Sequence, residues 1–134
     1  MIYNLIQYLR DTFPLYTFVQ LLDPSDTQAT IVVRELGGGS VTGYPMERVD
    51  SPVQIISRGQ DRFVAKQVIE DIYLELKEKF DFTLPAVLEL SLPELTLARI
   101  QANQTPGDMS QSGAGVYEYV VNFTVTYSDK TVSA

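Results

Sequence analysis

Apolar side chains recur every three to four positions in one long segment, residues 60–80. The apolar positions are Ala65, Val68, Ile69, Ile72, Leu76 and Phe80. This spacing places them on one face of an α-helix, with mostly charged residues on the opposite face. Asp61 suits the N-cap because its carboxylate can accept hydrogen bonds from the first free backbone amides. The pattern predicts an amphipathic helix over 60–80, in which Glu75 and Lys79 pair one turn apart.

A shorter helical repeat lies at the N-terminus, where Ile2, Leu5, Ile6 and Leu9 recur at the same spacing. Proline cannot continue a helix, so Pro14 is predicted to end it. Residues 15–22 are rich in β-formers and indicate extended chain, and a turn at 23–26 follows.

Alternating or β-branched runs predict strands over 27–36, 48–59 and 116–129. Along 116–129 one face would carry the aromatic and apolar side chains of Tyr117, Tyr119, Val121, Phe123, Val125 and Tyr127. Residues 87–103 also alternate. Because Pro93 interrupts them, they form either two strands or one strand with an edge bulge.

Three connections separate these elements: a glycine-rich loop over 37–45, a break at 81–85 after the long helix, and a polar loop over 104–115. The predicted order is α-β-β-β-α-β-β. Two helices cannot cover both faces of such a sheet. The sequence therefore predicts one α+β domain over 1–134, in two layers, with a mostly antiparallel sheet and the helices packed on one face.

The composition of the chain limits the catalytic and binding chemistry that it can carry out. The 134-residue chain carries a net charge of −7 and contains no His and no Cys. Without a basic patch, tight binding along a nucleic-acid backbone is not expected. Histidine- or cysteine-based catalysis is excluded, and neither a cofactor nor a metal is expected. Carboxylate-only chemistry stays open. We also expect a soluble protein made in a cytoplasm, because no apolar run is long enough to span a bilayer.

The glycine-rich loop resembles a phosphate-binding loop only in part. A P-loop needs Lys and Ser or Thr after its last glycine, but Tyr44 and Pro45 stand there after Gly43. A phosphate loop must also open a helix, whereas this loop leads into another strand. We therefore interpret the run Gly37, Gly38 and Gly39 as a connection between strands, which a partner protein could contact.

Acidic residues form the other candidate cluster. Asp71, Glu75 and Glu78 would share one face of a helix over 60–80. Interspersed lysines favour a solvated face over a metal site, and a functional use would be as a negative field. Reversing any one of these charges should leave the fold intact. The aromatic row of 116–129 is expected to pack in the core.

The polar loop before the last strand is long for a compact domain, and such loops often bind partners. Its candidate partner-binding residues are Asn103, Thr105, Pro106, Asp108, Met109 and Gln111. A simple hairpin tip is the alternative. If the loop docks on a partner, residues 103–115 should be mobile in a free subunit and ordered in an assembly.

Several stretches together resemble one protein family. They are "TFVQLLDP", "IVVRELGG", "SPVQIISRGQDRFVAKQVIEDIYLEL" and "YEYVVNFTVTY", and the most specific part is residues 53–76. This arrangement resembles the tail terminator proteins of long-tailed bacteriophages, also called tail completion or minor capsid proteins. The resemblance spans nearly the whole chain and includes no catalytic motif.

The resemblance implies a structural, non-enzymatic virion protein at the head-proximal end of the tail, assembled in the host bacterial cytoplasm. Its copies would form a ring of six that ends polymerisation of the tail tube and contacts a head-completion or connector protein. DNA would pass through the lumen without specific binding, and no membrane is involved. The loop before the last strand lacks a basic residue that such proteins are expected to carry.

Three alternatives stay open from the sequence. Another phage neck or head-completion protein would share much of this architecture. A carboxylate-dependent enzyme would need a deep pocket in which two acidic side chains converge. A generic interaction module would not form rings in the presence or absence of tail tubes.

Overall fold

The computed structural model describes residues 1–21, 28–37, 40–42, 48–111 and 115–128. Its elements, in chain order, are α1 (Ile2–Thr12), β1 (Phe18–Val19), β2 (Thr30–Glu35), β3 (Ser40–Thr42), β4 (Arg48–Gly59), α2 (Arg62–Leu76), β5 (Glu78–Leu84), a 3₁₀ turn η1 (Leu88–Leu90), β6 (Leu95–Ala102), β7 (Gly107–Gln111) and β8 (Tyr117–Ser128).

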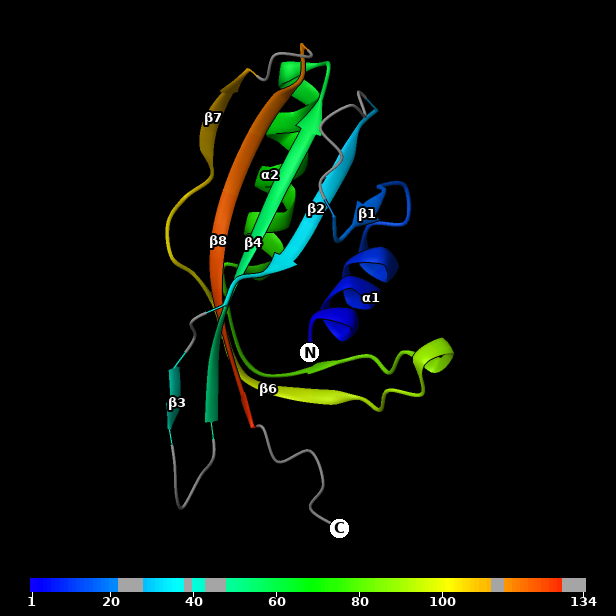
Figure 1. Ribbon diagram of the computed structural model, residues 1–134, viewed down its shortest axis with the longest axis vertical. Coiled ribbons are helices and arrows are strands. Elements are labelled where there is room, and N and C mark those ends of the chain that lie inside the picture. The colour runs from blue at the N-terminus through cyan, green and yellow to red at the C-terminus, as the bar shows by residue number, and fades with distance from the viewer. Residues whose placement is uncertain (22–27, 38–39, 43–47, 112–114, 129–134) are drawn as a thin grey trace.

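The strands form one eight-stranded sheet whose main path is β1-β2-β4-β8-β6-β5. β3 pairs with β4, β7 pairs with β8, and only the short β1–β2 pair is parallel. The two 12-residue strands β4 and β8 pair along their full length at the centre of the sheet (Figure 1). The mostly antiparallel sheet is thus confirmed.

Both helices lie on one face of this sheet, so the predicted two-layer α+β fold is confirmed (Figure 1). α2 packs on β4, β8 and β6, whereas α1 packs on β1, β2 and β5. One hydrophobic core joins the layers. Its fully buried side chains include Leu5 and Leu9 of α1, Ile69, Ile72 and Leu76 of α2, and Val33, Ile55, Val121, Phe123 and Val125 of the sheet. Burial of these side chains is the main force that holds the layers together.

Side chains along β8 alternate between buried and less buried, as the sequence predicts. Tyr119, Val121, Phe123 and Val125 are buried against the helices, and the residues between them lie on the opposite face. β2 and β4 also occupy the predicted segments. Of the described residues 15–21, however, only Phe18–Val19 forms a strand, which pairs with Ile31 and Val32 of β2.

The long helix ends earlier than predicted, at Leu76. Residues 78–84, which the sequence assigned to the end of the helix and to a break, instead form β5 and pair with β6. Phe80 therefore leaves the helical face and is 59% exposed on an edge strand. Strand pairing with residues 95–101 supplies backbone hydrogen bonds that local helical periodicity cannot reveal.

Within residues 87–103, one strand, β6 (Leu95–Ala102), follows the 3₁₀ turn, so the alternative of two strands is wrong. The alternative of one strand with a bulge is nearer to the structure, but the register shift lies between Leu97 and Arg99, and β6 is not an edge strand because it lies between β8 and β5. Leu88 and Leu90 sit on the turn, where the chain reverses between β5 and β6. This hairpin extends sideways from the helix layer (Figure 1).

Two predicted loops contain short strands. Ser40–Thr42 pairs with β4, and Gly107–Gln111 pairs with β8. Both are added at the margins of long strands, whose free backbone groups provide the template. Sequence periodicity gave no indication of either strand, because polar and glycine residues dominate both segments.

Candidate functional site

Asp71 and Glu75 project from α2 toward two tyrosines, Tyr8 within α1 and Tyr16 just after it. Tyr8 Oη donates a short hydrogen bond to Glu75 Oε1, and Tyr16 Oη donates to Asp71 Oδ2 at 3.3 Å. Asp71 Oδ1 also accepts from Gln67 Nε2 at 2.8 Å. These two carboxylates therefore connect α2 to the N-terminal part of the chain, a role that the sequence did not suggest.

The carboxylates also change the acidity of the tyrosines. Burial first, and then the hydrogen bond to Glu75, raise the pKa of Tyr8 to about 12. Burial and the negative charge of Asp71 raise the pKa of Tyr16. Ionising either phenol would place a second negative charge beside a carboxylate. Both tyrosines therefore stay neutral hydrogen-bond donors at physiological pH.

Glu78 does not share the helical face, so this part of the predicted acidic cluster is wrong. It lies on β5, where its carboxylate accepts from Arg99 Nη2 at 3.2 Å. Arg99 also stacks over Phe80, with its guanidinium carbon 5.2 Å from the ring centroid. Lys79 Nζ lies 3.5 Å from Glu75 Oε1, so that predicted pair is confirmed although Lys79 belongs to the strand.

The candidate partner-binding residues of 103–111 lie along β7 and the chain that leads into it. Asn103 Oδ1 accepts from Thr124 of β8 at 2.9 Å. Thr105 and Asp108 are exposed, Pro106 is half-buried, and Met109 is 43% exposed. Only the backbone of Gln111 is described. The segment is thus a paired edge strand with exposed side chains.

Asp108 also connects β7 to the start of α2. Arg62 Nη2 lies 3.8 Å from Asp108 Oδ2, and Arg62 Nε donates to Tyr119 Oη at 3.0 Å. The hydrogen bond to Tyr119, followed by the charge of Asp108, raises the pKa of Arg62. Arg62 therefore supplies the positive charge next to this segment, from a position distant in the sequence.

The glycine run is described only at Gly37, which is exposed. Its φ is not positive, and a Cβ built there would meet nothing within 4 Å. The backbone at Gly37 therefore does not require glycine. Gly38 and Gly39 lie outside the described residues, and the structure does not bring Gly37 and β7 together into one site.

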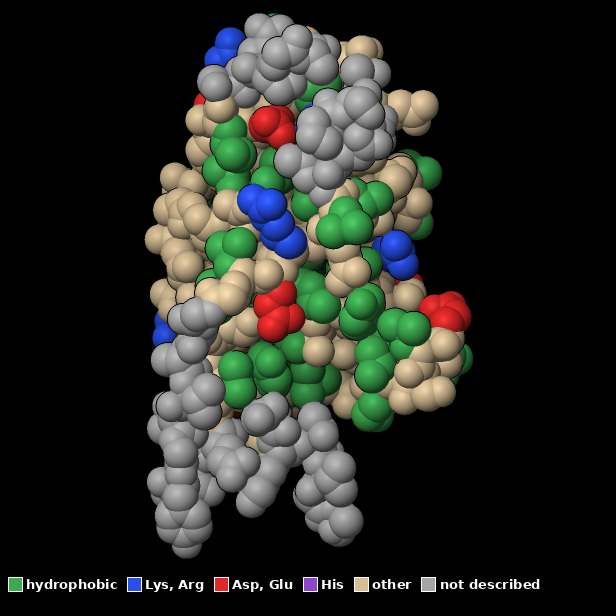
Figure 2. Space-filling model, in the orientation of Figure 1, with side chains coloured by type: hydrophobic (Ala, Val, Ile, Leu, Met, Phe, Trp, Pro, Cys, Tyr) green, Lys and Arg blue, Asp and Glu red, His purple; other side chains and the backbone are tan. Residues whose placement is uncertain are grey.

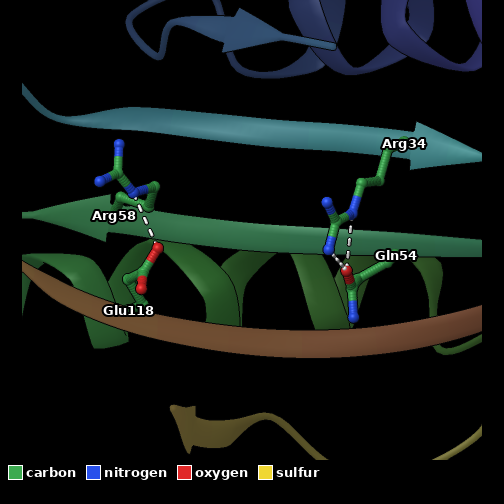
Figure 3. Close-up of polar contacts among 4 residues, drawn as sticks. All are labelled: Arg34, Gln54, Arg58 and Glu118. Atoms are coloured by element: carbon green, nitrogen blue, oxygen red, sulfur yellow. Dashed lines mark hydrogen bonds and ion pairs between the residues drawn. The ribbon is translucent and has the colours of Figure 1, made fainter. Parts of the chain in front are cut away.

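The face of the sheet opposite the helices carries a polar row that the sequence analysis missed (Figure 3). Arg58 Nε lies 2.8 Å from Glu118 Oε2 in an ion pair whose arginine side chain is only 2% exposed. Arg34 donates to Gln54 Oε1 through Nε, at 2.8 Å, and through Nη2. Such pairs satisfy charges that would otherwise be costly to bury. They could not be found from spacing, because their partners are 20 and 60 residues apart.

Exposed apolar side chains mark two further surfaces. Leu88 is 86% exposed and Leu90 50% exposed at the tip of the β5–β6 hairpin, while Phe63 is 81% and Leu74 62% exposed on α2. Hydrophobic side chains gather over the lower half of the molecule in Figure 2, where this hairpin lies. The sequence contained one indication of the exposed apolar surface on α2, since Phe63 and Leu74 lie outside the apolar face predicted for the helix.

Two cavities open beside α1 and β1. One, of about 260 Å³, lies between the segment before β1, the end of β4 and the first turns of α2. Asp61 is the acidic residue among the described residues that line it, and it accepts from Phe63 N at 3.0 Å and Val64 N at 3.2 Å as the predicted N-cap. The other, a groove of about 610 Å³, separates α1 and β1 from the hairpin tip, and within the described part of the chain its acidic lining residue is Glu89.

Among the described residues that line them, neither cavity brings together the two carboxylates that the enzymatic alternative requires. Within the described ranges, no three acidic side chains gather as a metal site would need. No helix in the described part of the chain is both long and apolar enough to cross a membrane. What the surface offers chemically is edge strands, exposed apolar side chains and charges, the means of protein–protein contact.

Comparison with known proteins adds the family. A family model described as bacteriophage tail terminator protein matches residues 5–129. No curated protein sequence matches the chain. The matched range includes all eight strands and both helices except the first residues of α1.

Proposed function

The chain belongs to the bacteriophage tail terminator family, a family of structural phage tail proteins, and we propose that it forms the ring that ends the tail tube. In this proposal six copies close on the head-proximal end of the tube and stop its polymerisation. The observation that carries the proposal is the family match over residues 5–129. The protein is then a virion component with an assembly role and no catalytic step.

The architecture supports ring formation by head-to-tail contacts. Two parts project from the layered body, namely the β3–β4 pair and the β5–β6 hairpin (Figure 1). β5 is an edge strand, and an edge presents backbone groups that a neighbour can contact. A contact between unlike surfaces repeats from copy to copy, and it closes into a ring when the rotation is right.

The charge distribution supports an inner wall past which DNA slides. The chain has a net charge of −7. On the face opposite the helices, Glu118 neutralises the buried Arg58, whereas Arg34 is hydrogen-bonded to the uncharged Gln54 and keeps its charge. A wall with few unpaired cations would not hold phosphates. We propose that DNA passes through the ring without specific binding.

The head-facing contact is proposed for residues 103–109. Thr105, Asp108 and Met109 expose a mixture of polar and apolar side chains on an edge. Such a mixture suits a partner that docks after the tube is complete, because the surface can stay exposed to water until the partner binds. The partner would be a head-completion or connector protein, and the tail tube protein would contact a different side of the ring.

Another role in the phage neck, such as head completion, is the second candidate. The same surfaces would serve it, since exposed edges and a projecting hairpin also suit a ring bound to the head. The two candidates differ in the structure to which the ring attaches, the tail tube or the head.

Electron microscopy of tail tubes polymerised with and without the protein tests the proposal. With the protein, tubes should carry one ring at one end, and their elongation should stop after its addition. A mock addition of an unrelated acidic protein of similar size is the control. Tubes that elongate unchanged and carry no ring would contradict the terminator role, whereas binding to heads alone would favour the second candidate.

A further inference from the structure

The outer side of α2 carries a stripe of exposed residues with a composition unusual for a solvated surface. Phe63, Lys66, Glu70, Leu74 and Lys77 occupy positions i, i+3, i+7, i+11 and i+14. At about 100° per residue these positions fall within one arc of the helix, away from the buried Ala65, Ile69, Ile72 and Leu76. We call these five residues the α2 stripe; it is roughly 21 Å long at about 1.5 Å per residue.

The α2 stripe combines apolar side chains with free positive charge. Phe63 is 81% exposed and Leu74 62% exposed, so the stripe presents two large apolar side chains that a partner could cover. Lys66 and Lys77 are exposed and have no ion-pair partner among the described residues. Glu70 between them is half-buried. The stripe is thus apolar at two points and carries a small positive excess.

The tip of the β5–β6 hairpin has the complementary composition. Leu88 and Leu90 are exposed, and Glu89 and Glu94 are exposed beside them. Residues 84–98 contain no Lys or Arg, so the tip is uniformly acidic. The base of the hairpin is held in place by buried Asn4 of α1. Its side-chain amide donates hydrogen bonds to the carbonyls of Pro85 and Pro93, one on each side of the hairpin tip.

We infer that the hairpin tip of one copy docks on the α2 stripe of the next copy. The leucines of the tip would pack on an apolar side chain of the stripe, and the glutamates of the tip would meet its lysines. Opposite charge at the rim and apolar contact at the centre are the usual composition of a specific interface. The two surfaces lie on different parts of the fold, so the contact is head-to-tail.

This inference rests on the proposed ring and names the contact that closes it. The commitment to a second copy comes from charge complementarity, since the same chain carries both the acidic apolar tip and the basic apolar stripe. A tail tube or head partner on either surface would leave the other surface without its complement.

Charge exchange between copies tests the docking. Variant one carries Lys66→Glu and Lys77→Glu, and variant two carries Glu89→Lys and Glu94→Lys. Each alone sets like charges against each other and should raise the protein concentration for half-maximal ring assembly on tail tubes by roughly tenfold or more. An equimolar mixture of the two variants should restore assembly, as should one chain with all four changes.

Matched variants keep the charges and serve as controls. Lys66→Arg with Lys77→Arg, and Glu89→Asp with Glu94→Asp, should assemble as the wild type does. Glu70→Gln should assemble at a lower concentration, because it removes the one opposing charge from the stripe. Circular dichroism of every variant establishes that it is folded before assembly is measured.

The outcomes separate this inference from the proposed function. Wild-type protein that never forms rings on tubes would overturn both. Wild-type rings that the four charge reversals leave unchanged would overturn the docking alone. Loss of assembly in each variant without recovery in the mixture would assign these charges to a different protein, and it would also overturn the docking.

Discussion

At the scale of single residues, a few polar side chains join parts of the chain that are far apart in sequence. Asn4 is buried, and its Nδ2 donates to Pro85 O at 2.9 Å and to Pro93 O at 3.0 Å. Tyr8 donates to Glu75 across the two helical segments. Both carbonyls that Asn4 binds flank the hairpin tip, so this residue fixes the direction in which the tip projects.

Asn4→Ala should lower the free energy of unfolding by about 2 kcal/mol, because two carbonyls at the base of the hairpin lose their donor. Urea denaturation followed by circular dichroism measures the change. Gln7→Ala on the same helix is the control, since Gln7 Nε2 bonds only exposed Asp11, and it should stay within about 0.5 kcal/mol of the wild type. Equal stability of the two variants would contradict the role given to Asn4.

Tyr8→Phe should lower stability at pH 7 by about 1 kcal/mol through loss of the hydrogen bond to Glu75. The pKa of Tyr8 is about 12 in the folded chain, above the ordinary value of 10.0, so the unfolded chain loses its proton first. Stability from this group is therefore complete below pH 10 and declines as pH rises from 10 to 12.

Urea denaturation at several pH values between 9 and 12 tests this dependence. The stability difference between wild type and Tyr8→Phe should shrink across that interval, since the variant has no phenol to ionise at this position. A difference that stays constant with pH would show that the phenol is not held neutral by its surroundings.

At the scale of elements, α2 is defined by different causes at its two ends. Its start is local, because the Asp61 carboxylate accepts from the amides of Phe63 and Val64. Its end is not local. The apolar repeat continues to Phe80, but the chain leaves the helix after Leu76 to pair with β6. Asp81, with φ of 47°, lies within the new strand, so this edge is irregular.

Asp61→Ala should cost about 1 kcal/mol of stability, because two amides of the first turn lose their acceptor. Asp61→Asn retains an acceptor and should cost only a small part of that amount. Thermal or urea denaturation of the two variants measures both effects. An alanine variant as stable as the asparagine variant would indicate that the cap contributes nothing.

At the scale of the whole molecule, the arrangement leaves distinct surfaces for distinct partners. The helices cover one face of the sheet, the hairpin tip projects at one side, and β7 forms an edge elsewhere (Figure 1). In the proposed ring, the tip and the α2 stripe serve neighbouring copies, while residues 103–109 serve the head. The family match concerns the whole arrangement, since it covers residues 5–129.

Hydrogen exchange in the free subunit and in assembled tails tests this division of surfaces. Amides of the hairpin tip and of residues 103–106 should exchange faster in the free subunit than in the tail. β8, at the centre of the sheet, should be well protected in both states and is the internal control. Equal exchange at 103–106 in both states would contradict its use as a docking segment.

The sequence alone determined those elements whose buried face can be read from the local spacing of apolar residues. Helical spacing in α1 and α2, and strict alternation in β8, state which face of each element is apolar, and burying those faces leads to a two-layer α+β domain. The aromatic row of β8 is in the core as expected, and the resemblance seen in the sequence agrees with the family match.

Only the tertiary structure decided that strands form in segments whose sequence shows no clear alternation of apolar and polar residues. β5, β3 and β7 exist because neighbouring strands supply their hydrogen-bond partners, which are distant in the sequence: the first register pair of β5 and β6 joins Glu78 to Gln101. The same holds for the Arg58–Glu118 ion pair and for Asn4. Long-range pairing depends on which segments come into contact when the chain collapses, and local periodicity in the sequence does not predict those contacts.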